Sequence, residues 1–178
     1  PAVSIPSLVE LSREAHSAGI VTGCLTNGYM TEESAETMAS VFSFFNISLK
    51  GLSEAFNKKY IGIDSPAPVL RNIRRLARDR HVEITTPVIP GANDNEIDAV
   101  AGFLSDISPS IPWHVFRLLP EDEMINEEYP GIDAIDRELT DARRMLKYNY
   151  LHNFVGSDWV NTICPSCGNV LIDRFSQG

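Results

Sequence analysis

Residues 20–51 read IVTGCLTNGYMTEESAETMASVFSFFNISLKG and contain a strand, a turn, a helix and a second strand, in that order. The apolar run from Ile20 to Thr26 is typical of a short buried strand, and Asn27-Gly28 tolerates the positive φ of a tight turn. Thr31 is placed to cap the following helix. From Phe45 to Lys50 apolar and polar residues alternate, which is typical of a strand with one buried face. These residues therefore predict a βα unit.

The same alternation continues on both sides of this unit. Apolar residues recur at helical spacing over 7–18, 69–80 and 93–108, with a short helix at 54–60, and strand patterns cover 81–90 and 112–119. Strands separated by helices indicate parallel βα units with right-handed crossovers. After residue 124 come an acidic loop, a helix over about 132–147, a short strand over 151–155 and a CxxC tail. We expect an α/β domain with a parallel sheet of about four strands over 1–124 and a C-terminal extension over 125–178.

Composition narrows the classes of partner. The 178 residues include 15 Lys+Arg and 24 Asp+Glu, a formal net charge of −9, so no basic surface for nucleic acid or an anionic membrane is expected. No apolar run is long enough to span a membrane, and no signal peptide is visible, which favours a cytoplasmic protein. Three cysteines cannot all pair within the chain, so reduced thiols are expected. A small molecule or another protein is the expected partner.

Polar residues follow four consecutive predicted strands. These positions are Asn27-Gly28, Lys50-Gly51, Pro90-Gly91 and Pro120-Glu121. Because ligands of parallel α/β folds bind at the carboxyl ends of the strands, we expect the site there. Lys50 is the strongest single candidate, since its ammonium can hold a carboxylate or a phosphate as a compact point charge. The alternative is that Lys50 only extends from the sheet edge into water.

The tail contains half of a zinc site. Cys164-Pro-Ser-Cys167-Gly168 lets two thiolates converge on one metal, but a second pair is missing unless His152, Cys24 or a partner chain completes it. A plain reduced loop is the alternative. Cys24, inside an apolar strand, is predicted to be a small core residue, and His114 a core histidine with a satisfied hydrogen bond.

Five ordered motifs together resemble a known family. They are Leu25-Thr-Asn-Gly-Tyr-Met30, Asn46-Ile-Ser-Leu-Lys-Gly51, Glu83-Ile-Thr-Thr-Pro-Val-Ile-Pro-Gly91 with Asn93-Asp94, Pro112-Trp-His114 with Arg117, and Cys164-Pro-Ser-Cys-Gly168 with Leu171-Ile172 and Arg174. In this order and spacing the chain resembles radical S-adenosylmethionine (SAM) enzymes of the pyruvate formate-lyase activating enzyme type, in the AmmeMemoRadiSam system branch. The likeness covers nearly the whole chain.

The resemblance implies a (β/α)6 barrel and two cofactors, SAM and a [4Fe-4S] cluster on a CxxxCxxC loop. Together the cofactors generate a 5′-deoxyadenosyl radical. The sequence holds no CxxxCxxC and no glycine-rich segment ending in Glu-Pro. The chain therefore looks like the C-terminal two-thirds of such an enzyme, a partial parallel (β/α) barrel with the cluster ligands absent. Alone it is expected to be inactive and to expose a sheet edge that favours dimerisation.

The resemblance also assigns residues to SAM. The family's Asp-x-Lys falls on Ser48, Leu49 and Lys50, where the lysine would contact the SAM carboxylate and the first residue would lie by the ribose or a monovalent cation. Ser48 stands in place of the usual aspartate, so no cation is expected there. Thr26 and Asn27 would lie near the methionine moiety, and Val88 to Gly91 beside the adenosine. Asp122 stands close to where the activases often carry a histidine facing SAM.

Two other functions remain open. One is a non-catalytic half-barrel that binds a partner protein through the barrel mouth and a structural zinc at Cys164 and Cys167. The other is a cluster-free barrel enzyme that binds a phosphorylated metabolite, for which the sequence lacks a glycine-rich phosphate loop. The substrate of the expected enzyme, a protein or a small molecule, is not specified by these residues.

Overall fold

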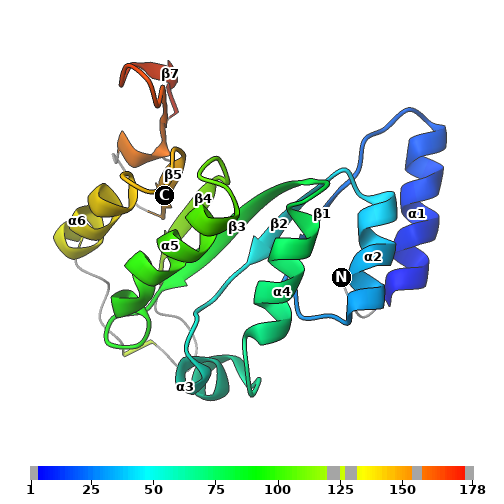
Figure 1. The fold of residues 1–178 in the computed structure, drawn as a ribbon, viewed down its shortest axis with the longest axis horizontal. Helices are drawn as coiled ribbons and strands as arrows, with labels where there is room; N and C mark the ends of the chain where they lie inside the picture. Colours follow the sequence, from blue (N-terminus) through cyan, green and yellow to red (C-terminus); the bar gives the residue numbers. More distant parts are fainter. Residues whose placement is uncertain (1–3, 120–124, 127–131, 154–157, 175–178) are drawn as a thin grey trace. The chain divides into compact units, whose positions relative to one another are not determined.

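The computed structural model describes residues 4–119, 125–126, 132–153 and 158–174. Five parallel strands form one sheet in the order β1-β2-β3-β4-β5, and β6 and β7 form a separate two-stranded sheet (Figure 1). The expected partial (β/α) barrel is confirmed, with five strands in the sheet where the sequence predicts about four. The chain divides into two compact units, Pro1–Leu49 with Ser53–Ile84 and Lys50–Leu52 with Thr85–Gly178. Strand β3, His81–Val88, begins in the first unit and ends in the second.

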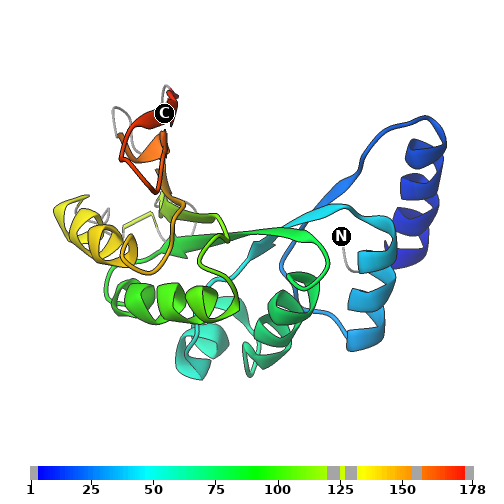
Figure 2. The ribbon, with the colours of Figure 1, turned by 45° about the horizontal axis from the view of Figure 1, so that its top comes forward.

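The first unit contains the predicted βα unit. Its elements are α1 Ile5–Ser17, β1 Gly23–Thr26, α2 Glu32–Val41, β2 Phe44–Ser48, α3 Glu54–Phe56, a π-helical turn η2 Asn57–Ile61 and α4 Ala67–Leu76. Strands β1 and β2 are parallel, with Cys24 opposite Phe45 and Thr26 opposite Ile47. Helices α2 and α4 lie side by side (Figure 2). Thr31 caps α2 by accepting a hydrogen bond from Ser34 N at 3.2 Å, as predicted.

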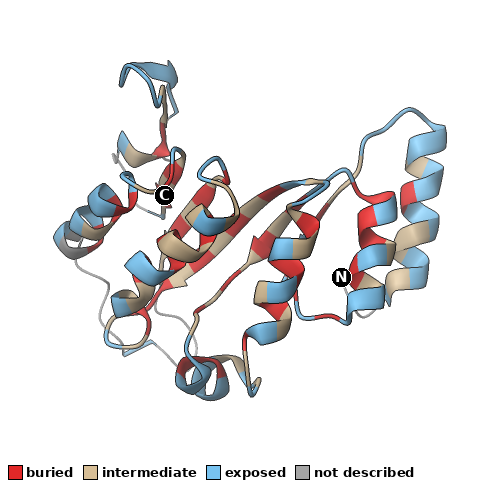
Figure 3. Cartoon of the chain, viewed as in Figure 1, coloured by how far each residue is buried: buried red, intermediate tan, exposed pale blue. Residues whose placement is uncertain are grey.

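One face of these strands is buried and the other is open. Cys24, Phe45 and Ile47 of the strands are buried, as are Met38 of α2 and Ile73 of α4. Figure 3 shows buried positions on these strands and helices in red. On the opposite face Leu25 is 72% exposed and Phe44 43% exposed. The prediction that Cys24 is a core residue is confirmed. The predicted strand from Ile20 is shorter than expected, since β1 begins at Gly23 and both Ile20 and Val21 are exposed.

The second unit repeats the arrangement around β4 and β5. Its elements are η3 Asp94–Glu96, α5 Ile97–Ile107, β4 Trp113–Arg117, α6 Ile132–Ala142, β5 Asn149–His152, η5 Asp158–Val160, β6 Thr162–Ile163 and β7 Val170–Ile172. Strands β4 and β5 are parallel, with Trp113 opposite Asn149 and Val115 opposite Leu151. Trp113, Val115 and Leu151 are fully buried, together with Leu104 of α5 and Leu139 of α6. Helices α5 and α6 contact each other along this core.

Two sequence expectations for this unit need correction. The strand predicted over 151–155 as part of the extension lies instead at Asn149–His152 and joins the main sheet beside β4. His114 is not in the core, because the register of β4 buries Trp113 and Val115 and leaves His114 half-exposed on the other face. The predicted boundary after residue 124 stays a prediction, since residues 120–124 lie outside the described residues.

Candidate functional site

The end of β1 is a fixed turn. Thr26 is buried, and its hydroxyl accepts a hydrogen bond from Gly28 N at 3.2 Å. Asn27 is exposed, and its Oδ1 accepts from Tyr29 N at 3.1 Å. The fully buried Asn72 of α4 donates from Nδ2 to Gly28 O at 2.9 Å and to Met30 O at 2.8 Å. A helix side chain therefore holds the backbone around Asn27.

Gly28 is required at this turn for two reasons. Its φ of +70° lies in the left-handed region, which a side chain disfavours. A Cβ at this position would also come within 2.8 Å of Ile47 Cγ2 and 3.2 Å of Val69 Cγ1. The turn therefore packs against β2 and α4 of the same unit.

At the end of β2, Ser48 and Leu49 differ in how far their side chains are buried. Ser48 is half-buried on the face opposite the buried Ile47. Leu49 is 1% exposed, so its side chain packs in the core and only its backbone is open to a ligand. In its own backbone turn, Leu49 N donates to Ile47 O at 3.1 Å.

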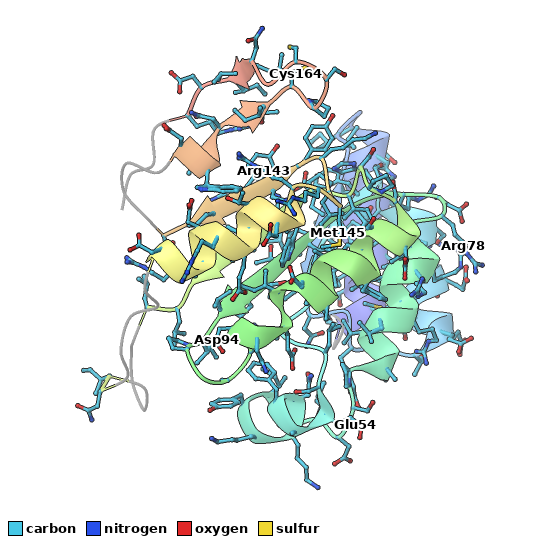
Figure 4. All side chains as sticks on the ribbon, turned by 60° about the vertical axis from the view of Figure 1, so that its left-hand side comes forward. Glu54, Arg78, Asp94, Arg143, Met145 and Cys164 are labelled. Atoms are coloured by element: carbon cyan, nitrogen blue, oxygen red, sulfur yellow. The ribbon has the colours of Figure 1, made fainter. Side chains whose placement is uncertain are left out.

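In the second unit, Lys50 to Leu52 are held by side chains from the segment after β3. The buried Asn93 donates from Nδ2 to Lys50 O and to Pro87 O, each at 2.7 Å, and its Oδ1 accepts from Ile89 N at 2.8 Å. Glu96 Oε2 accepts from Leu52 N at 2.5 Å. Asp94 Oδ2 accepts from Gly91 N at 3.0 Å at the start of the same helical segment (Figure 4). Asn93 thus ties the residues after β2 to the end of β3.

The ammonium of Lys50 is left without a partner among the described residues. Its side chain is half-buried, and no described residue forms a hydrogen bond or ion pair with it. Val88 is 1% exposed, and its carbonyl oxygen accepts from Leu118 N at 3.1 Å. The side chain of Val88 therefore belongs to the core. Asp122, the remaining predicted SAM contact, lies outside the described residues.

The three cysteines occupy two different environments. Burial raises the pKa of the Cys24 thiol, and its sulfur contacts Leu25 O at 3.6 Å. Cys164 has a lowered pKa because the backbone N–H groups of Ser166 and Cys167 and the Cys167 thiol hydrogen-bond its sulfur. Among the described residues no three His, Cys, Asp or Glu side chains gather in one metal-binding group.

These cysteines do not fit a [4Fe-4S] cluster. Such a cluster is held by cysteine thiolates. Here only Cys164 and Cys167 are close in sequence, while Cys24 is buried within a strand. In the part of the chain that the structure describes, the three cysteines therefore do not form a ligand set for such a cluster.

A row of rings lies on the open face of β4 and β5. His114 stacks on Tyr150 with ring centroids 5.0 Å apart, and Phe116 stacks on His152 at 4.6 Å. His114 Nδ1 and His152 Nε2 are hydrogen-bonded at 2.9 Å. Desolvation by burial lowers the pKa of His152 to about 4, and the charges of His114 and Arg174 act in the same direction. The sequence reasoning missed this cluster, although alternate residues of two adjacent strands carry it.

Comparison with known proteins identifies the family. The sequence profile of the Radical SAM superfamily matches residues 4–104. The chain is 28% identical over 181 aligned residues to the uncharacterized protein MJ0808 of Methanocaldococcus jannaschii, covering 98% of this chain and 53% of that protein. It is 32% identical over 131 residues to the isethionate sulfite-lyase activating enzyme of Nitratidesulfovibrio vulgaris, covering 69% of this chain and 40% of that enzyme.

Solved structures show the same fold. A domain of a pyruvate-formate lyase-activating enzyme from Bacteroides vulgatus matches with a TM-score of 0.69 at 21% identity, over 86% of this chain and 94% of that domain. SuiB of Streptococcus suis bound to S-adenosylmethionine matches with a TM-score of 0.64 at 13% identity, over 81% of this chain and 36% of SuiB.

The chain belongs to the radical SAM superfamily, as its motifs indicate. It spans about half or less of the length of the curated relatives it matches. No helix in the described part of the chain is long and apolar enough to cross a membrane.

Proposed function

We propose that this chain is the SAM-binding and substrate-facing portion of a radical SAM enzyme of the glycyl-radical-activating type. The observation that carries the proposal is Lys50. Its ammonium has no described partner, while its backbone is fixed by the buried Asn93 just after a parallel strand. Strand ends of this kind are where parallel α/β folds bind ligands. A lysine ammonium held there suits the carboxylate of SAM.

The three residues at the end of β2 have different roles in this proposal. Lys50 pairs with the SAM carboxylate, and Ser48 donates a hydrogen bond to a ribose hydroxyl. Leu49 contributes its backbone, because its side chain is buried.

Residues after the other strands complete the proposed site. Thr26 holds the turn from which the exposed Asn27 amide reaches the methionine moiety. Val88 supports the wall beside the adenosine from the core, and Asp122 is proposed at the edge of the site.

The [4Fe-4S] cluster has no ligands in this chain, so the chain alone is proposed to bind SAM without cleaving it. A reduced cluster held by residues outside this chain would supply the electron for SAM cleavage. The test is anaerobic reconstitution of the chain with iron, sulfide and dithionite, followed by assay for 5′-deoxyadenosine. We expect SAM binding and no 5′-deoxyadenosine. A SAM-cleaving cluster formed on this chain would contradict the proposal that the chain binds SAM but lacks the cluster ligands needed to cleave it.

The free edge of β1 is proposed to pair with a further strand. In the sheet order β1 is terminal, and beside it an apolar hollow of about 280 Å³ is lined by Leu8, Leu11, Leu25 and their neighbours. An unpaired edge with exposed apolar side chains favours strand addition. In the working enzyme we propose that another barrel strand covers it, and that the chain alone dimerises through it.

Partners and compartment follow from the same proposal. The acidic chain is proposed to act on a protein or small-molecule substrate and to bind neither nucleic acid nor membrane. The name of the Nitratidesulfovibrio vulgaris relative, an activating enzyme for a lyase, favours a protein substrate. An iron–sulfur enzyme with three free thiols suits a reducing compartment, for which we propose the cytoplasm.

The second candidate is a binding module without catalysis, held together by a structural zinc. Cys164 and Cys167 lie on one tight turn, in which Gly168 N donates to Cys164 O at 2.9 Å, and two cysteines at this spacing favour a zinc at the pair. Zinc and SAM binding are compatible, so only the absence of SAM binding would favour this module over the enzyme. We propose the zinc as a structural element of the radical SAM enzyme.

A further inference from the structure

A small hollow lies at the start of β5. It has a volume of about 10 Å³ and is lined by two cationic side chains, Arg143 and Lys147, by two amides, Asn149 and Asn161, and by two tyrosines and an isoleucine. No carboxylate is among the described residues that line it, although the chain as a whole has a formal net charge of −9. A lining of this kind attracts an anion.

The side-chain amide of Asn149 is buried without a partner. Asn149 is 3% exposed, and neither its Nδ2 nor its Oδ1 forms a hydrogen bond within the described part of the chain. The register of β5 causes this burial, because Asn149 lies opposite the fully buried Trp113 and shares the buried face of its strand with Leu151. A buried amide that has lost its hydrogen bonds to water and gained none carries a free-energy penalty. A ligand that accepts from Nδ2 and donates to Oδ1 removes this penalty.

Arg143 is held in place while its hydrogen-bonding edge stays free. It directly follows α6 (Figure 4), and its guanidinium lies over the Trp159 ring, 3.6 Å from the ring centroid. Trp159 is itself fixed, because its Nε1 donates to Asp136 Oδ1. No residue in the described ranges forms a hydrogen bond or ion pair with the Arg143 guanidinium. Stacking leaves the N–H groups in the guanidinium plane available, and this planar set suits two oxygens of one oxyanion.

Two further donors line the hollow. Asn161 is 9% exposed, and its Oδ1 accepts from Arg174 N at 2.7 Å, which leaves its Nδ2 without a partner among the described residues. The Lys147 ammonium donates to the neutral Ser110 Oγ at 3.3 Å and pairs with no described carboxylate. The donors around the hollow therefore outnumber its one buried unpaired acceptor, Asn149 Oδ1. This balance suits an anion that also carries one proton to donate.

We propose that this hollow binds a hydrogen phosphate ion. The hollow is no larger than a water molecule, so the ion lies across its mouth, beside the exposed Arg143 and Lys147, with oxygens directed inward. Inorganic phosphate keeps at least one proton at neutral pH, so its hydroxyl donates to Asn149 Oδ1 while charged oxygens accept from Asn149 Nδ2 and Arg143. The site is at the amino end of β5, whereas the proposed SAM-binding Lys50 follows the carboxyl end of β2. It is therefore a site for an effector and is independent of SAM binding.

The test is a titration of the whole chain with inorganic phosphate at neutral pH and constant ionic strength, followed by the NMR signals of the Asn149 and Asn161 amides and the Trp159 indole. Sulfate is the matched control ion, because it is also tetrahedral and doubly charged but has no proton to donate. We expect saturable shifts of the three signals with phosphate and an affinity about tenfold weaker for sulfate. Equal affinities for the two ions would overturn the proposal, as would shifts that do not saturate. No shift at all would overturn it too and would show that only water fills the hollow.

Variants separate phosphate binding from the folding of the chain. Arg143→Met removes the charge but keeps an apolar contact with Trp159, and it is expected to weaken phosphate binding about tenfold. Arg144→Met is the matched control, since Arg144 is exposed and pairs with Asp141 at the surface, and it should bind phosphate like the parent. Asn149→Val removes the unpaired amide and should abolish the preference for phosphate over sulfate, with circular dichroism as the check of its fold.

The exposed Arg143 decides the proposal even where Asn149→Val fails to fold. Phosphate binding by Arg143→Met as tight as that by Arg144→Met would contradict the proposal. A folded Asn149→Val that still prefers phosphate to sulfate would contradict it as well.

Discussion

The side-chain amide of Asn93 donates to the carbonyl oxygen of Lys50 at 2.7 Å, across 43 positions of sequence. The same amide donates to Pro87 O, and its oxygen accepts from Ile89 N, so one buried side chain satisfies three backbone groups. Asn93 is a positioning residue for the proposed site. It fixes the backbone that carries the proposed SAM-binding lysine but leaves the lysine side chain free.

Replacing Asn93 by alanine should therefore destabilise the protein and weaken SAM binding together. Removal of the amide leaves three buried or half-buried backbone groups unpaired, and we expect a loss of about 2–4 kcal/mol in the free energy of unfolding. Urea denaturation measures the loss. Asn95→Ala, two positions away on an exposed residue, is the matched control and should stay within about 0.5 kcal/mol of the parent. Equal losses for both variants would contradict the role given to Asn93.

The turn after β1 is expected to reject a side chain. Gly28→Ala introduces a methyl group at a positive φ and within 2.8 Å of Ile47 Cγ2, so we expect a loss of about 1–3 kcal/mol in the free energy of unfolding. Thermal unfolding provides the measurement. Gly62→Ala is an informative comparison, because Gly62 also has a positive φ but a Cβ added there would meet no atom within 4 Å. If Gly62→Ala loses less stability than Gly28→Ala, the extra loss at Gly28 comes from the contact of the new methyl group with its neighbours. Equal losses in the two variants would contradict a packing role for Gly28.

Acid should weaken the fold through His152. Its folded pKa of about 4 lies below the ordinary histidine value of about 6.5, so between these values the unfolded chain binds more protons than the folded one. The free energy of unfolding should be unaffected by this group above pH 6.5 and should fall as the pH drops from about 6.5 to about 4. His152→Gln should flatten that part of the profile. His81→Gln removes an imidazole from an exposed position and is the control. If His152→Gln leaves the change of the unfolding free energy between about pH 6.5 and about pH 4 as it is in the parent, the prediction is contradicted.

Local features of this fold were predictable from sequence, and long-range ones were not. The cap at Thr31 and the glycine turn at Gly28 depend on neighbouring residues, and the structure has them as expected. The strand predicted to run to Lys50 ends earlier, at Ser48. The structural role of Asn93 depends on Lys50, 43 positions away, and no local pattern distinguishes it from an ordinary helix-opening asparagine.

Strand register explains the remaining differences. In β4 the residues Trp113 and His114 are neighbours that face opposite sides, and period-two patterning alone does not say which side is the core. Trp113 is fully buried and donates from Nε1 to Thr86 Oγ1 at 2.9 Å, which settles the register and places His114 on the open face. Likewise, the fifth strand at Asn149–His152 is short, and only its pairing with β4 shows that it belongs to the sheet.

The central claim is that Lys50 binds the carboxylate of SAM, and the most direct measurement compares two ligands on two proteins. Binding of SAM and of decarboxylated SAM is titrated by protein NMR shifts for the parent chain and for Lys50→Met, with the exposed Lys58→Met as control. We predict that the parent and Lys58→Met bind SAM about tenfold more tightly than the decarboxylated compound, and that Lys50→Met loses this preference. An equal preference in Lys50→Met, or no SAM binding by the parent, would contradict the account.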